Sequence, residues 1–291
     1  MKKLRILMIG AHPDDPDGCG GGTALKYVAR GDEVRFLSVS DGRAGHFSMP
    51  PDALASRRRK EADRVAELIG ITYDVWDIPD GEVEASLENR RRIVRYIREF
   101  APDLVITHRN NDYHADHRNV ALLVQDASYL LTVPNYCMDT PAMASMPVIA
   151  FFSDRFKQPP FRADVVVPID EVVDKKYEVL RAHESQYFEW LPFNKGTLDT
   201  VPEGAKARAE WFRSPRIPRD RVLTVEDLNI GVTPSNHSEY RMARAAVLYR
   251  DVLRAQYGDE AADRVAFAEA FEISEYGKQP KKAELAELFP L

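Results

Sequence analysis

The sequence predicts an α/β protein whose core is a doubly wound, mostly parallel sheet of the Rossmann-like type, with an insertion and helices towards the C-terminus. Over the first 130 residues, short apolar runs alternate with longer segments that carry an apolar stripe at helical spacing. Glycine and Asp-Gly turns separate the two kinds of segment. A chain of 291 residues is long enough for one large domain of this class.

The N-terminal elements follow in order from this alternation. An apolar run at 4–10 is typical of a buried strand, and a glycine-rich turn at 18–22 leads into a helix that ends near Arg30. Further strands are expected at 34–39, 73–76 and 104–107, and further helices at 52–69, 87–100 and from about 117 to 131. Alternating strands and helices imply parallel pairing of the strands.

The pattern becomes less regular after residue 131. Two more strands are expected at 147–152 and 164–168, and a helix with Asp170 as its N-cap is expected at 170–186. Residues 188–235 contain prolines and aromatic residues with weak periodicity, and we expect them to form a long, lid-like insertion.

The C-terminal segments are expected to be helical. An amphipathic helix is predicted at 238–257, and the charged tail at 260–291 is also expected to form helix. We therefore predict a core at residues 1–187, with residues 188–291 forming the lid-like insertion and C-terminal helices packed on the same domain.

Composition and charge exclude several classes of protein. The formal net charge is -6, whereas general binders of nucleic acid or anionic membranes are usually basic. No segment approaches the roughly 18 apolar residues that a membrane span requires. The N-terminal apolar run is too short for a signal peptide, and Cys19 and Cys137 lie far apart in sequence. We expect a cytoplasmic protein, and the sequence leaves open whether it forms a homo-oligomer.

Two polar clusters follow the ends of two predicted strands. His12, Asp14 and Asp15 come directly after the first strand, and His114 and His117 follow the strand at 104–107. Parallel strands bring their carboxyl ends to one edge of the sheet, where ligands of such folds bind. Histidine and aspartate are zinc ligands, so the clusters predict one metal site.

The residues of the two clusters suggest separate roles. His12, Asp15 and His117 provide a set of three protein ligands, which leaves a fourth position for water. Asp14 is then the candidate base that takes the proton of that water. His114 lies three residues before His117, on the same face at a helix start, and can face the substrate carbonyl. The alternative is structural: a solvated turn, a helix-capping pair and a half-buried strand-end histidine.

These motifs resemble those of the PIG-L / LmbE-like family of zinc-dependent N-deacetylases. The resemblance rests on Ala11–Asp15 with the glycines at 18–22, on His114–His117, and on the segment 182–186, and it covers about residues 3–187. Pro16 is a departure, because the family commonly has glutamate there. The resemblance implies a Rossmann-like fold and one Zn²⁺ per chain, although iron(II) suits similar ligands.

The resemblance also implies residue roles. It assigns zinc to His12, Asp15 and His117, the general base to Asp14, and the electrophile or acid to His114. By softer analogy, Arg58, Asp80 and Tyr113 are candidate substrate-binding residues.

The predicted function is hydrolytic removal of N-acetyl groups from N-acetylated amino sugars or their conjugates. One alternative is an amidase that cleaves larger acyl groups by the same mechanism, with its pocket shaped by residues 188–235. Another is a non-catalytic, Rossmann-like nucleotide-binding protein. The glycines at 18–22 do not match the register of a dinucleotide-binding motif, and Asp14 and Asp15 would repel phosphate.

Overall fold

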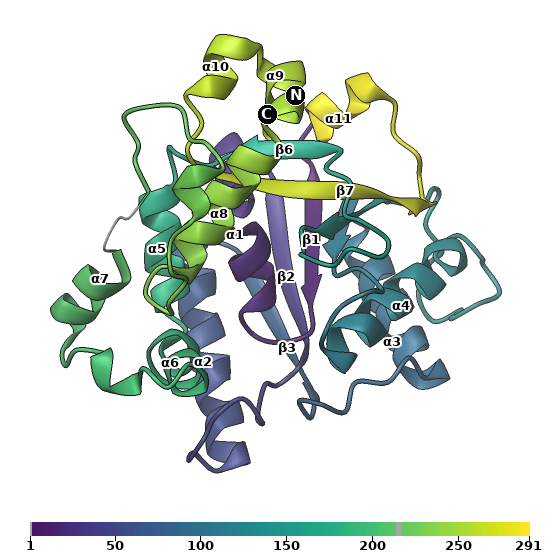
Figure 1. Ribbon diagram of the computed structural model, residues 1–291. Helices are drawn as coiled ribbons and strands as arrows, with labels where there is room; N and C mark the ends of the chain where they lie inside the picture. Colours follow the sequence, from purple (N-terminus) through teal and green to yellow (C-terminus); the bar gives the residue numbers. More distant parts are fainter. Residues whose placement is uncertain (1, 214–216) are drawn as a thin grey trace.

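A computed structural model describes residues 2–213 and 217–291. Helices flank both faces of one seven-stranded sheet, in the order β3-β2-β1-β4-β5-β7-β6 (Figure 1). The strands are β1 (Arg5–Gly10), β2 (Glu33–Ser40), β3 (Thr72–Ile78), β4 (Leu104–Thr107), β5 (Val148–Phe152), β6 (Val165–Pro168) and β7 (Ala268–Gly277). The first five strands are parallel, and β7 runs antiparallel between β5 and β6. This architecture confirms the predicted α/β fold class.

The helices fall into an N-terminal and a C-terminal set. The longer helices of the first set are α1 (Asp15–Arg30), α2 (Pro51–Ile69), α3 (Leu87–Phe100), α4 (Ala115–Leu130) and α5 (Val173–Arg181). The second set contains α6 (Leu191–Asn194), α7 (Ala205–Arg213), α8 (His237–Leu248), α9 (Arg250–Tyr257), α10 (Asp259–Asp263) and α11 (Lys282–Leu288), with a π-helix at Ser185–Trp190 and 3-10 turns at Leu198–Thr200 and Glu226–Leu228. Within the described residues, no helix is long and apolar enough to cross a membrane.

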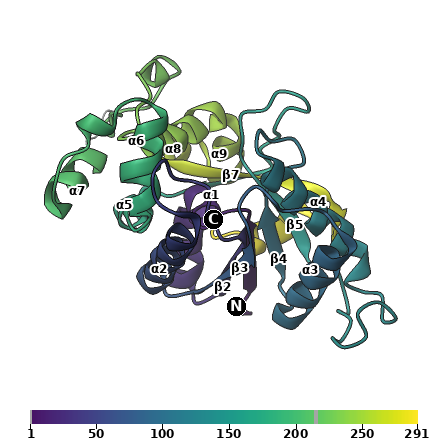
Figure 2. The ribbon, with the colours of Figure 1, turned by 90° about the horizontal axis from the view of Figure 1, so that it is seen from below.

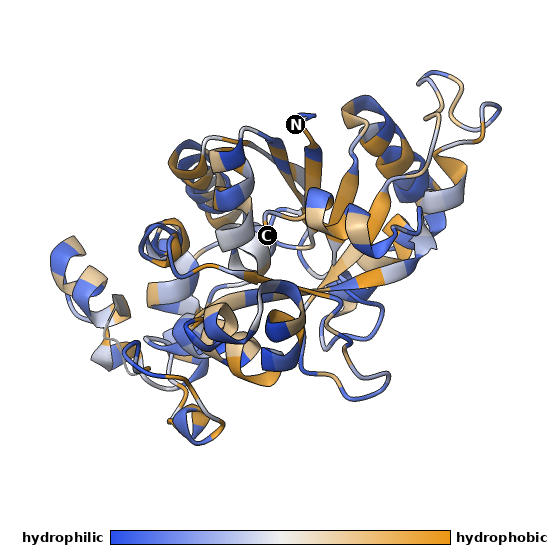
Figure 3. Cartoon of the chain, turned by 90° about the horizontal axis from the view of Figure 1, so that it is seen from above, coloured by the Kyte–Doolittle hydropathy of each residue, from blue (hydrophilic) through white to orange (hydrophobic). Residues whose placement is uncertain are grey.

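Strand β1 lies in the middle of the sheet and is covered on both faces. Ile6 and Met8 pack in the apolar cluster formed with α1, α2 and α5, whereas Leu7 and Ile9 pack with α3 and α4. Figure 2 shows these two groups of helices on opposite sides of the sheet. The hydropathy colouring of Figure 3 places apolar residues along the strands and polar residues on the outer helix faces. An uninterrupted apolar run is what a strand buried on both faces requires.

The glycine-rich segment lies inside helix α1, so the expected turn at 18–22 is wrong. The helix begins at Asp15, the last residue of the first polar cluster. An added Cβ would lie 2.9 Å from Met8 Sδ at Gly20 and 2.8 Å from Ile169 Cγ2 at Gly22. These glycines therefore allow α1 to approach the sheet closely, and the approach brings Asp15 up to the strand edge.

The C-terminal tail contains a strand that the sequence reasoning assigned to helix. β7 carries a glutamate at every third position, at 269, 272 and 275, and glutamate is a good helix former, which favoured a helical prediction. It pairs with β5 and β6, so the C-terminal segment completes the sheet that the N-terminal half begins. Glu269 of β7 accepts hydrogen bonds from the backbone of Gly22 and Thr23 in α1, and it is paired with Lys176 of α5. This buried carboxylate joins the two parts of the chain.

Three other expectations need correction. Helix α5 begins at Val173, because Asp170 accepts hydrogen bonds from the backbone N–H groups of Ala266 and Phe267 instead of capping the helix. The segment 188–235 contains short helices, including α7. The single helix expected at 238–257 is divided into α8 and α9 at Tyr249.

Candidate metal centre

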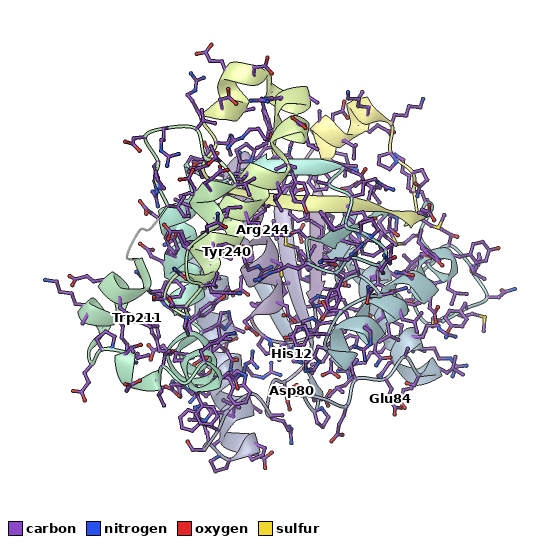
Figure 4. The ribbon with its side chains drawn as sticks, in the orientation of Figure 1. His12, Asp80, Glu84, Trp211, Tyr240 and Arg244 are labelled. Carbon is purple, nitrogen blue, oxygen red and sulfur yellow. The ribbon has the colours of Figure 1, made fainter. Side chains whose placement is uncertain are left out.

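The candidate site lies where the order of the sheet reverses. β1 pairs with β2 on one side and with β4 on the other, so the segments that follow β1 and β4 border the same crevice. In open α/β sheets this reversal point is where ligands bind. Figure 4 shows His12 and Asp80 close together at this edge. Helix α4 starts at Ala115, and its first turn carries His117 into the same crevice.

Three nitrogen and oxygen atoms converge in this crevice. His12 Nδ1 lies 3.4 Å from Asp15 Oδ2, His117 Nε2 lies 3.4 Å from the same oxygen, and the two nitrogens are 3.3 Å apart. A tetrahedral ion with bonds of about 2.0–2.2 Å separates its ligand atoms by about 3.3–3.6 Å. The donor set and its spacing therefore fit a metal ion, and the three residues are those predicted from the sequence.

The outer nitrogens of both imidazoles face carboxylates. His12 Nε2 lies 3.0 Å from Asp80 Oδ1 and 3.3 Å from Asp116 Oδ2, and His117 Nδ1 lies 3.1 Å from Asp112 Oδ1. Metal-binding histidines usually have such a partner on the second nitrogen, because it fixes the tautomer and the orientation of the ring. The arrangement points the remaining nitrogens towards Asp15.

The carboxylates also set the protonation of the two histidines. Burial alone lowers the pKa of His12, but the carboxylates of Asp116, Asp15 and Asp80 outweigh it and raise the pKa well above its usual value. Burial also lowers the pKa of His117, but the carboxylates of Asp15 and Asp112 outweigh burial, so the pKa of His117 is raised. A cation that binds these nitrogens must displace protons, because only the neutral imidazole is a ligand.

Asp14 lines both cavities at the cluster, and one of its carboxylate oxygens contacts Arg58. The guanidinium of Arg58 is ion-paired with Asp14 Oδ1 and donates a second hydrogen bond to Gly42 O at 3.2 Å. Arg58 is 2% exposed, although it stands in a run of four basic residues on α2. Its guanidinium therefore holds Asp14 in place, and the second carboxylate oxygen of Asp14 remains to accept a proton.

His114 is the N-cap of α4, and its ring lies on the same side as that of His117, with the ring centroids 5.2 Å apart. Its Nδ1 accepts a hydrogen bond from the backbone N–H of Asp116 at 3.2 Å. Burial and the positive charges of His12 and His117 lower the pKa of His114. The ring is therefore neutral at pH 7 and carries its proton on Nε2.

The three candidate substrate-binding residues occupy different environments. Asp80 and Arg58 are buried against His12 and Asp14, so each contacts another residue of the site. Tyr113 is 76% exposed, and its ring lies edge-on to His114 and His117 at 5.7 and 5.5 Å. Tyr113 is the one of the three whose side chain lies open at the surface of the site.

Sequence reasoning missed His108 as a member of the cluster, and it assigned no role to Asp112 and Asp116. His108 Nε2 lies 3.2 Å from Asp15 Oδ2, and its ring stacks on His117 with centroids 4.0 Å apart. The available signal was its position, since His108 is the first residue after β4. The sequence alone gave no sign that Asp116 and Asp112 face the outer nitrogens of His12 and His117.

The segment 182–186 packs against α1 and α2, and its last residue, Gln186, lines the smaller of two cavities at the site. His183 Nε2 contacts Asp17 Oδ2 at 2.7 Å, and both side chains are fully buried. Ser185 donates hydrogen bonds to Glu61 from its backbone N–H and its hydroxyl group. These contacts fix α1 and α2 relative to the π-helix, and so position Asp14 and Arg58 indirectly.

Two cavities open onto the cluster and share Asp14, Asp15, Tyr113, His117 and Leu191. The smaller cavity, of about 350 Å³, also contains Asp80, His114, Trp190 and Asn194. The larger, of about 450 Å³, extends towards α8 and the segment after β5, and Arg155, Arg241 and Arg244 line its far wall. A molecule held at the cluster can therefore extend in two directions.

The fold and the cluster together define an α/β protein with a histidine–carboxylate site, suited to a metal ion, at the reversal point of its sheet. The family model described as PIG-L: GlcNAc-PI de-N-acetylase matches residues 7–128. The probable N-acetyl-alpha-D-glucosaminyl L-malate deacetylase 2 of Bacillus anthracis is 30% identical over 224 residues, which cover 73% of this chain and 93% of that protein. This chain belongs to the PIG-L family, as its motifs predicted.

Other relatives show how wide the chemistry of similar proteins is. The 4-oxalmesaconate hydratase of Pseudomonas putida is 26% identical over 200 residues, which cover 66% of this chain and 78% of that protein. The solved structure of the N,N'-diacetylchitobiose deacetylase of Pyrococcus horikoshii has a TM-score of 0.63 at 21% identity, over 93% of this chain and 84% of that one. The structural likeness confirms the fold.

Proposed function

We propose that this protein is a zinc-dependent hydrolase that removes N-acetyl groups from N-acetylated amino sugars or their conjugates. The observation that carries the proposal is the convergence of His12 Nδ1, Asp15 Oδ2 and His117 Nε2 at 3.3–3.4 Å from one another. Membership of the PIG-L family and the deacetylase of Bacillus anthracis support it. One zinc per chain is the stoichiometry expected of a single three-residue ligand set.

The proposed mechanism assigns a separate task to each residue. Zinc held by His12, Asp15 and His117 would supply Lewis acidity, which lowers the pKa of water and polarises a carbonyl group. Asp14, oriented by Arg58, accepts a proton from the attacking water and delivers it to the departing amine nitrogen. The new bond joins the water oxygen to the acetyl carbon, the C–N bond breaks, and acetate and a free amine are released.

His114 is proposed to stabilise the oxygen of the acetyl group during the reaction. Its Nδ1 is occupied by the backbone N–H of Asp116, so a neutral ring can donate only from Nε2. A hydrogen bond to developing negative charge is worth more than one to the ground-state carbonyl. This role as a neutral donor requires no protonated His114 at pH 7.

The substrate contacts are proposed on the smaller cavity. The side chain of Tyr113 is free to contact a ligand. Asp80 contacts His12 and Arg58 contacts Asp14, so their first role is to position these two residues. Trp190 lines the same cavity and offers an aromatic surface for a sugar ring. We also propose, from the sequence, that the protein is cytoplasmic. The sequence leaves open whether it forms a homo-oligomer.

Zinc content and acetate release test the proposal together. We expect purified protein to hold about one zinc per chain and to release acetate from N-acetylglucosamine or its conjugates. Acyl-chain profiling of the same amine separates a deacetylase from the alternative amidase of larger acyl groups. Stabilisation by nucleotide without zinc binding would favour the non-catalytic alternative and contradict the proposal.

A second candidate function is the addition of water to a carbon–carbon double bond of a carboxylated substrate. Two observations favour it. Three arginines line the larger cavity and could bind the carboxylates of such a substrate, and the relative from Pseudomonas putida is a hydratase. The same base and the same cation can activate water for either reaction. Loss of the ultraviolet absorbance of an unsaturated polycarboxylate, without acetate release, would identify the hydratase.

A further inference from the structure

Three guanidinium groups line one wall of the larger cavity, which we term the arginine wall: Arg155, Arg241 and Arg244. Arg241 and Arg244 project from adjacent turns of α8, and Arg155 comes from the segment after β5. In the view of Figure 4, Arg244 lies on α8 above His12 at the strand edge. Asp15 and His117 line the same cavity, so the arginine wall faces the candidate metal centre.

The arginine wall has no carboxylate partner among residues 2–213 and 217–291. Arg241 Nη2 contacts the thiol of Cys19 at 3.2 Å, and Arg155 Nη2 contacts His237 Nε2 at 3.3 Å. Burial, followed by the charges of Arg241 and Arg155, lowers the pKa of His237 to about 3, so this imidazole is neutral. Burial raises the pKa of the Cys19 thiol, so both partners are uncharged.

The carboxylates of the cavity are already engaged elsewhere. Asp154 is bound by two nitrogens of Arg109, at 2.6 and 2.9 Å. Asp112 faces His117, and Asp14 is paired with Arg58. Asp15 contacts His12, His108 and His117, and its charge helps to raise the pKa of Arg241. Within the described part of the chain, the arginine wall is therefore left without a carboxylate in direct contact.

Such a cluster is costly unless an anion completes it. Partial burial and the neighbouring charges of Arg241 and Arg244 lower the pKa of Arg155, which is the sign of mutual repulsion. The protein as a whole carries a net charge of -6, so the cluster is not part of a generally basic surface. Guanidinium groups match carboxylate and phosphate oxygens with paired hydrogen bonds.

We propose that the arginine wall binds an anionic group of the substrate, a carboxylate or a phosphate, while the scissile amide lies at the candidate metal centre. The inference rests on the proposed function, since it places the anion on the molecule that is hydrolysed. The two cavities meet at Asp14, Asp15 and His117, so a sugar ring in the smaller cavity can carry its anionic conjugate into the larger one. The substrate class is therefore an acidic conjugate of an N-acetylated sugar.

Direct binding tests the anion site without any turnover. L-malate and inorganic phosphate are titrated calorimetrically into wild-type protein, with methyl N-acetylglucosaminide as the neutral ligand. We expect Arg244→Gln to weaken binding of the preferred anion about 10- to 100-fold, since a hydrogen bond to a charged group contributes about 1.5–3 kcal/mol. Arg264→Gln, which removes an exposed arginine paired with Glu260, is the matched control and should change nothing.

The two ligands distinguish the two anions. Tighter binding of malate assigns the wall to carboxylates, and tighter binding of phosphate assigns it to phosphate esters. Failure of wild-type protein to bind either anion, or equal binding by wild type and Arg244→Gln with an unchanged melting temperature, would overturn the proposal. Arg241→Gln gives a second, independent measurement if Arg244→Gln does not fold.

Turnover of matched substrates then separates this proposal from the function on which it rests. N-acetylglucosaminyl L-malate, N-acetylglucosamine 1-phosphate and methyl N-acetylglucosaminide share the same amide. We expect Arg244→Gln to raise KM about 10- to 100-fold for the preferred acidic substrate and to leave hydrolysis of the neutral one unchanged. Equal losses on all three substrates would contradict the anion site. Anion binding without acetate release from any of them would contradict the deacetylase function alone.

Discussion

The histidine–carboxylate cluster and the arginine wall form two walls of the site, and they differ in how their charges are paired. On the wall formed after β1 and β4, every histidine of the ligand set faces a carboxylate and the carboxylates have partners. On the arginine wall, Arg241 contacts the Cys19 thiol and Arg155 contacts His237, and no carboxylate among the described residues makes a direct contact with the guanidinium groups. The first wall offers nitrogen and oxygen atoms that suit a cation, and the second offers hydrogen-bond donors that suit an anion. The difference suggests that one wall performs the chemistry and the other selects the molecule.

The two walls also differ in the elements that carry them. Asp15 is held at the strand edge by hydrogen bonds from the backbone N–H groups of Ala11 and His12, at 3.0 and 2.8 Å. The arginine wall consists of long side chains on α8 and on a connecting segment. Groups fixed by the sheet suit a reaction common to a family, whereas helix side chains can be exchanged without altering the sheet.

The largest expected effect is on the first wall. His117→Ala should reduce turnover to the background rate, because it removes one of the three proposed ligands. His108→Ala is the matched variant, since His108 contacts the same oxygen of Asp15 and stacks on His117. Steady-state acetate release compares them, and we expect His108→Ala to remain active. Equal inactivity of the two variants would mean that His108 is as necessary as His117 and would contradict the assignment of ligands without it.

Removal of the proposed base should have the next largest effect. Asp14→Asn keeps the shape of the side chain and should lower kcat about 10²- to 10⁴-fold while zinc content stays at the wild-type level. Metal analysis beside single-turnover kinetics makes the measurement. A wild-type rate would remove Asp14 from the mechanism, and loss of zinc would show that it acts as a ligand.

The sequence predicted the first wall far better than the second. His12, Asp15 and His117 were found because each stands near the end of an apolar run, and a parallel sheet brings such ends together. The arginine wall was not foreseen because α8 lies more than 200 residues beyond β1, and no local pattern reveals that Arg241 approaches Cys19. Arg58 shows the same limit, since its basic run gave no sign of burial beside Asp14.

Substitution of Glu269 should weaken the contact that joins the C-terminal strand β7 to helices α1 and α5. This carboxylate is 4% exposed and binds α1 and Lys176 at once. Glu269→Gln leaves the Lys176 ammonium buried without its counter-charge, and it should reduce the free energy of unfolding by about 3–5 kcal/mol. Chemical denaturation measures the loss. A change below about 1 kcal/mol would show that β7 and α1 are not joined in this way.

The carboxylates behind the ligand set should have a smaller effect. Asp80→Asn removes the charge that faces His12 Nε2 at 3.0 Å and should weaken zinc binding about 10- to 100-fold. Competition with a chromophoric chelator gives the dissociation constant. The matched variant Asp77→Asn alters an exposed neighbour that pairs with Arg92, and it should leave the constant unchanged.

The smallest expected effect is the dependence of stability on pH in the metal-free protein. Because the folded-state pKa values of His12 and His117 are raised, the stability that they contribute is complete below pH about 6.5 and is lost as the pH rises through the folded values. His108 and His114 have lowered pKa values in the folded protein, so above pH 7 both are neutral in the folded and in the unfolded state. They therefore do not oppose this trend. The melting temperature of chelator-treated protein should fall above pH 7, and that of zinc-loaded protein should not. Parallel curves would contradict the protonation assigned to the cluster.

The most direct test of the central claim is a zinc titration of metal-free protein, wild type beside His117→Ala. The account predicts one zinc per chain for the wild type, with release of protons on binding, and loss of that binding in the variant while the melting temperature of the metal-free protein shows that it remains folded. Absence of zinc binding by the wild type, or unchanged binding by folded His117→Ala, would contradict the three-residue metal centre at the strand edge.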